Sequence, residues 1–64
     1  MECNVSYEFR LKGAPPTDPW NLQAKQYVVD VPNELSGAAL IDWLERYILL
    51  DTPLLGEIRY VTVL

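Results

Sequence analysis

The side chains that could do chemistry in this 64-residue sequence are few and scattered. There is no histidine, and Cys3 is the single cysteine. Histidine is the commonest general base and metal ligand, and one thiol cannot build a zinc or iron–sulfur site within a chain. Gly13, Gly37 and Gly56 are isolated, so the sequence has no glycine-rich phosphate loop. The composition therefore predicts a protein that is not an enzyme and uses no metal or cofactor.

Acidic side chains on a predicted helix are one candidate for binding a partner. The helix is expected over residues 36–50, with Asp42 and Glu45 on its polar face and Asp51 directly after it. Solvated charge is the ordinary role of such residues, and Asp42 is spaced to pair with Arg46 one turn on. The second interpretation is an acidic patch that recognises a basic surface on a partner.

Trp20 is the other candidate, because it lies in a loop stiffened by prolines, GAPPTDPWNLQ. Three prolines in six residues cannot join a sheet ladder, so the segment is expected to be an ordered loop or a stiff arm. The indole either folds back as a lid over one end of the core or serves as an anchor for a partner. In the second case Asp18 would supply part of the polar rim.

The charge and length of the chain narrow the class of partner. The formal net charge is −4 and the five Lys and Arg residues are dispersed, which argues against binding nucleic acid through its phosphates and favours a protein partner with a basic surface. No stretch has the ~20 apolar residues of a membrane span, and the N-terminus lacks signal-peptide features, so a cytoplasmic protein is expected. Residues 1–64 are expected to form one small domain, for which self-association, including a homodimer, is reasonable.

Hydrophobic periodicity predicts three strands and one helix, in the order β-β-α-β. The strands are expected over residues 3–12, 25–31 and 57–64. The positions expected to face inward alternate along each strand: Cys3, Val5, Tyr7, Phe9 and Leu11 in the first; Tyr27, Val29 and Val31 in the second; Ile58, Tyr60, Thr62 and Leu64 in the third. The helix has Ser36 as its N-cap, with Asn33 as a rival. Its apolar arc is wider than packing on one sheet face requires, which predicts that something besides the sheet covers part of the helix.

These elements predict an α+β fold, a three-stranded and mainly antiparallel sheet with one helix packed on one face. The third strand can lie beside the first and antiparallel to it, which we favour, or beside the second and parallel to it. In this arrangement Val28, Val61 and Val63 would lie on the outer face of the sheet. They are then a candidate patch for self-association or for a partner.

The arrangement of a strand ending in VDVP, a capped helix carrying AAL and Trp43, and a last strand EIRYVTV is similar to that of small inhibitors of host RNA polymerase made by lytic bacteriophages. The resemblance spans residues 27–63 and implies the β-β-α-β fold and an inhibitory role. Three function classes follow. The first is a viral inhibitor that blocks a host RNA polymerase or a defence complex, as anti-CRISPR proteins do; the others are a self-assembling structural subunit and a small-molecule binding module.

Overall fold

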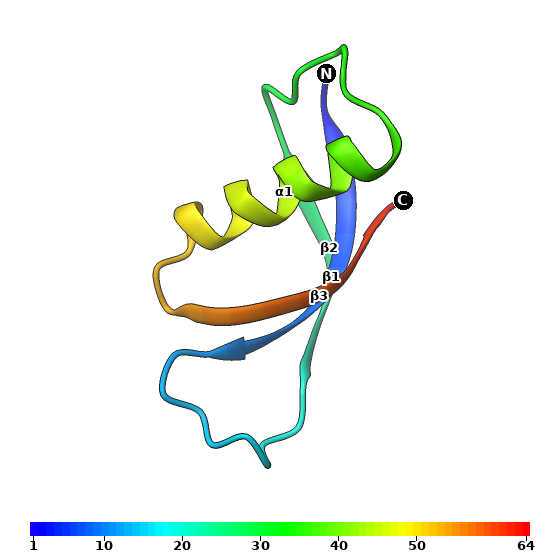
Figure 1. Cartoon of the computed structure of the whole chain (residues 1–64). Coiled ribbons are helices and arrows are strands. Elements are labelled where there is room, and N and C mark those ends of the chain that lie inside the picture. Colours follow the sequence, from blue (N-terminus) through cyan, green and yellow to red (C-terminus); the bar gives the residue numbers. More distant parts are fainter.

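The chain folds into a three-stranded sheet with one helix lying across one of its faces (Figure 1). The computed structural model describes residues 1–64. The elements are β1 (Cys3–Leu11), β2 (Asn21–Val28), α1 (Gly37–Asp51) and β3 (Leu55–Val63). The strand order is β2-β1-β3, and both pairings are antiparallel. The predicted β-β-α-β fold with a central first strand is confirmed, and the parallel alternative for the third strand is wrong.

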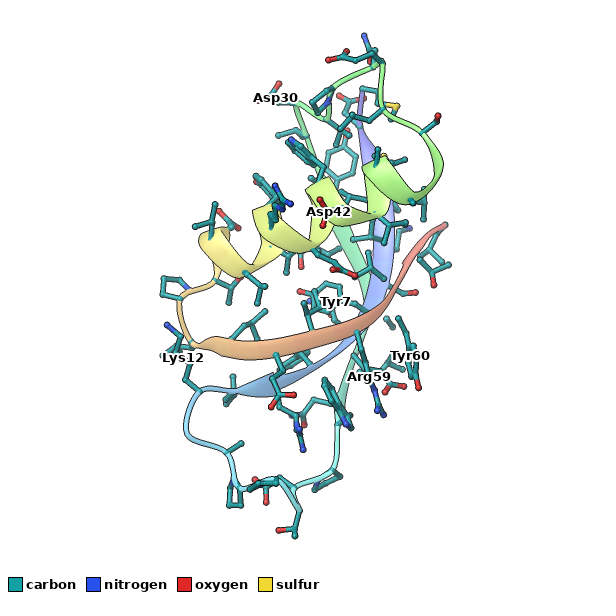
Figure 2. All side chains as sticks on the ribbon, in the orientation of Figure 1. Tyr7, Lys12, Asp30, Asp42, Arg59 and Tyr60 are labelled. Atoms are coloured by element: carbon teal, nitrogen blue, oxygen red, sulfur yellow. The ribbon has the colours of Figure 1, made fainter.

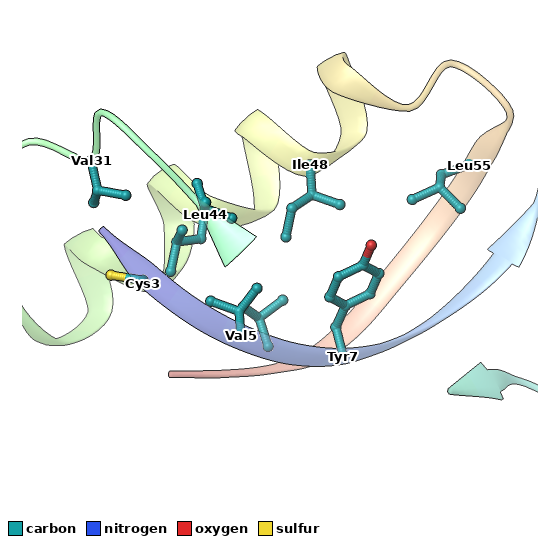
Figure 3. Packing of buried hydrophobic residues seen from close by; sticks show 9 residues of the cluster. Cys3, Val5, Tyr7, Val31, Leu44, Ile48 and Leu55 are labelled. Atoms are coloured by element: carbon teal, nitrogen blue, oxygen red, sulfur yellow. The ribbon is translucent and has the colours of Figure 1, made fainter. Parts of the chain in front are cut away.

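Buried and more exposed side chains alternate along most of β1, and this alternation defines the two faces of the sheet. Cys3, Val5 and Tyr7 are buried and point towards α1 (Figure 3). Successive strand residues point to opposite sides, so Glu8 and Arg10 lie on the face away from the helix. All nine buried residues of the protein are hydrophobic, which places one continuous core between the sheet and the helix.

The helix matches its predicted range within one residue at each end. Ser36 occupies the N-cap position with an extended backbone, although its side chain makes no capping hydrogen bond. At the other end, the backbone N–H of Thr52 donates to the carbonyl oxygen of Ile48 at 3.0 Å and closes the last turn. Leu44 and Ile48 are fully buried against the sheet.

The wide apolar arc of α1 is not fully covered. Trp43 and Tyr47 are half-buried and stack ring on ring, with centroids 5.4 Å apart and planes inclined by 8°. Leu50 remains 82% exposed. The further cover predicted for this arc is therefore not supplied by another element of the chain.

The second strand differs from its prediction in range and in phase. Val28 pairs with Cys3, and directly opposite residues share a face of the sheet, so Val28 is buried. Tyr27 and Val29, predicted to face inward, are exposed. Val31 does reach the core, but from the loop that follows the strand.

A bulge in β3 reverses the phase of its second half. Tyr60 has a φ of 58°, and β3 places one extra residue opposite Tyr7. Such a bulge re-aims the side chains that follow it. Tyr60 is therefore exposed, and Val61 faces the core.

The predicted outer patch of Val28, Val61 and Val63 is wrong, because the side chains of β2 and β3 alternate in a different phase from the one predicted. Val28 and Val61 are core residues, and Val63 alone of the three is exposed. The patch expected to mediate self-association does not exist as a surface.

Candidate functional site

The face of the sheet away from α1 has no helix packed on it, and it carries both charged and apolar side chains. Figure 2 shows Arg59 and Tyr60 on this side and Tyr7 on the helix side. Leu22 pairs with Glu8 across the sheet and Tyr27 pairs with Asn4, so both β2 side chains share this side. We call this side the open face; its members used below are Glu8, Arg10, Leu22, Tyr27, Glu57, Arg59 and Tyr60.

Four charges of the open face form two ion pairs between the end of β1 and the start of β3. Arg59 contacts Glu8 through Nε and Nη2, each 2.8 Å from Oε1. Arg10 donates from Nη2 to both carboxylate oxygens of Glu57 at 3.0 Å. Glu8 faces Arg59 and Arg10 faces Glu57 in the strand register, so the signs alternate along and across the strands. We call these residues the four-charge cluster.

Trp20 lies against this cluster and fixes the loop that carries it. Its ring centroid is 4.0 Å from the guanidinium carbon of Arg59 and 4.5 Å from that of Arg10. Arg10 also donates from Nη1 to the carbonyl oxygen of Pro16 at 2.9 Å. Cation–π contact and this hydrogen bond hold the proline-rich loop on the sheet. The indole folds back, as the lid alternative expected, but it covers charged groups on the open face instead of the end of the core.

The residues predicted to bind a partner fall into two groups on opposite sides of the molecule. Asp18 is exposed in the loop of Trp20, on the side of the open face. Asp42, Glu45 and Asp51 lie on α1, across the sheet. The structure does not bring the two groups together, so a single partner surface cannot use all five.

On the helix, one predicted acidic residue is paired and the others are available. Asp42 Oδ2 lies 2.9 Å from Arg46 Nη2, and both side chains are largely exposed. Glu45 is half-buried and Asp51 is exposed. The last turn contains no basic residue, so negative charge prevails at the helix end, where the helix dipole is negative as well.

Two leucines at this helix end are the most exposed large hydrophobic residues of the protein. Leu50 is 82% exposed and Leu54 is 73% exposed. Together with Asp51 they form what we call the helix-end patch. Leu50 belongs by its spacing to the apolar arc of the helix, which predicts burial, and Leu54 lies in the turn before β3. Periodicity therefore does not reveal that either leucine is exposed.

On the core side of the helix end, Tyr7 is held in its neutral form. Its hydroxyl donates a hydrogen bond to Gln26 Oε1. Burial raises the pKa of Tyr7 above its ordinary value of 10.0, and the nearby negative charge of Asp51 raises that pKa further. The group has the structural role of a buried hydrogen-bond donor.

The surface shows no pocket, and no three His, Cys, Asp or Glu side chains lie together as metal ligands would. Cys3 is a free thiol buried in the core. The helix lacks the length and apolar content needed to cross a membrane. Comparison with protein-family models, curated proteins and solved structures finds no match to this chain.

Proposed function

We propose that the chain is a non-enzymatic protein-binding module, an inhibitor of the viral type that binds and blocks a larger host protein complex through its helix-end patch. The host RNA polymerase and CRISPR or other defence effectors are the complexes to which we assign it. The place of action is then the host cytoplasm. No cofactor and no direct contact with nucleic acid is required.

The observation that supports this function is the composition of the helix-end patch. Leu50 and Leu54 are the two most exposed large hydrophobic side chains of the protein, and both lie at one end of the helix. Asp51 lies between them in the chain, and no cation of the last helical turn neutralises it. An apolar hollow rimmed by Lys or Arg on the partner is the complementary surface. Glu45 extends the same negative potential along the helix, whereas Asp42 is paired with Arg46.

The direct test measures inhibition of purified complexes by the purified chain. Bacterial RNA polymerase and a CRISPR effector complex would be titrated in transcription and DNA-cleavage assays. Replacing Leu50 and Leu54 together by Ala should weaken inhibition at least about tenfold. Both side chains are exposed, so folding should be unaffected.

The control is Leu22→Ala, which truncates a leucine that is 69% exposed on the open face. This variant should inhibit as well as the parent. The proposed function is wrong if neither complex is inhibited at stoichiometric concentration, or if inhibition depends on Leu22 and not on the helix-end patch.

A homo-oligomeric assembly subunit is the second candidate function. The open face favours it, since this face occupies one whole side of the sheet and exposes Leu22, Tyr27 and Tyr60. The third class, a small-molecule binding module, has no pocket to support it.

A further inference from the structure

The open face combines the residue types that are concentrated at protein interfaces. Trp20 lies against Arg10 and Arg59, and Tyr60 flanks the same Arg59, whose guanidinium carbon is 4.6 Å from the Tyr60 ring centroid. Aromatic residues and Arg are enriched in interface cores. Around them Leu22 and Tyr60 are 69% and 67% exposed. The open face therefore has the composition of a protein interface. The distribution of its charges indicates which kind of partner it fits.

The four-charge cluster is neutral, whereas the charged side chains outside it are mostly acidic. The four-charge cluster holds two of the nine carboxylates and two of the five cations, which leaves seven negative and three positive side chains elsewhere. A strongly basic partner would therefore gain more electrostatic attraction from the acidic surface outside the four-charge cluster than from the cluster itself. Two copies of this chain, each with a net charge of −4, meet with the least repulsion where the neutral four-charge clusters face one another.

The pattern of signs in the four-charge cluster is complementary to itself. A two-fold axis lying between two apposed open faces, parallel to the strands and midway between β1 and β3, brings Glu8 of one copy over Arg59 of the other. The same axis brings Arg10 over Glu57. Each cluster then lies opposite a cluster of complementary sign pattern, with the two Trp20 rings between them. Such self-complementarity is what an isologous interface requires. We infer that the open face is a homodimer interface and that its occupant is a second copy of this chain.

The backbone at Tyr60 fits this role. A φ of 58° is uncommon for a residue with a bulky side chain, and here it turns the ring out onto the open face beside Arg59. Unfavourable backbone conformations of this kind cluster at functional positions. In the dimer the ring packs on the partner copy.

The size of the face sets the expected strength of the dimer. Strands of eight and nine residues, at about 3.3 Å per residue and about 4.8 Å apart, give a flat footprint of roughly 400 Å². Side-chain relief and the Trp20 loop enlarge it towards the lower limit for specific interfaces. We therefore expect a reversible dimer with a dissociation constant in the micromolar range.

The test is light scattering after size-exclusion chromatography, from about 5 µM to about 1 mM protein. The mass should rise from 7.3 kDa towards twice that value. Tyr60→Asp should raise the dissociation constant at least about tenfold, because it removes the ring and adds a negative charge beside the neutral four-charge cluster. Asp tolerates a positive φ and would lie beside Arg59, so the monomer should still fold.

The matched control is Leu54→Asp, which adds the same charge at an equally exposed position in the helix-end patch. It should leave the dimer intact while weakening inhibition of the host complex, whereas Tyr60→Asp should do the reverse. A mass of 7.3 kDa up to about 1 mM overturns the dimer. Equal loss of self-association in both variants also overturns it, since net charge and not this face would then control the mass.

Discussion

At the scale of single residues, Tyr7 makes the stability of the fold sensitive to alkaline pH. Its pKa is raised in the folded protein by burial and by the charge of Asp51, and the unfolded chain titrates near 10.0. Above pH ~10 the unfolded state therefore binds fewer protons than the folded state, so stability falls as pH rises. The loss begins near pH 10 and continues up to the folded pKa.

Replacing Tyr7 by Phe should remove this pH dependence. At pH 8 the variant should be less stable by about 1 kcal/mol, because the half-buried Gln26 loses its hydrogen-bond donor. Above pH ~10 the difference between parent and variant should shrink. Urea unfolding at pH 8 and pH 10.5 measures both values, and Tyr60→Phe, which removes an exposed hydroxyl, serves as the control. A difference that grows with pH would contradict this role for Tyr7.

At the scale of elements, the helix carries buried and exposed leucines whose truncation should change the stability of the fold by different amounts. Leu44 is fully buried, and truncating such a residue to Ala costs about 2–5 kcal/mol. A 64-residue domain has about 3–10 kcal/mol in total, so Leu44→Ala should leave a large unfolded fraction at 25 °C. Leu50→Ala makes the same change on the same helix at an exposed position and should alter stability by less than about 0.5 kcal/mol. Circular dichroism with urea distinguishes the two; equal effects would place Leu50 in the core.

The same scale shows how far sequence patterns reach. The ranges of the first strand and of the helix were predictable to within one residue, because their periodicities run without interruption from a clear start to a clear end. Leu11, predicted to face inward at the end of the first strand, is exposed. The phase of β3 was not predictable, because a tyrosine at positive φ looks in sequence like any other strand tyrosine. Which side chains of β2 face inward depends on which of its residues pairs with Cys3 in β1. That pairing is long-range and has no local signal in the sequence. The open face was hidden for these reasons, and the position of Trp20 depends on two arginines that only folding brings together.

At the scale of the whole molecule, the two proposed surfaces lie on opposite sides of the sheet. A dimer joined through the open faces leaves both copies of α1 pointing outward. Each helix-end patch then stays accessible to a host complex whether the chain is a monomer or a dimer. Dimerisation and inhibition therefore use separate surfaces and do not compete.

The unfolding temperature should report this association independently of mass. A dimer that forms only between folded chains is stabilised by mass action, so the midpoint Tm should rise with protein concentration. For a domain of this size 1 kcal/mol corresponds to about 4–8 °C, and we expect Tm to rise by at least about 5 °C between about 5 µM and about 500 µM. Leu54→Asp should show the same rise. Tyr60→Asp should have one Tm at all concentrations, because its open face no longer closes on a second copy. A parent Tm that does not change across this range would mean that the open face stays exposed to water, and its charge pattern would then serve only to join β1 to β3 within one chain.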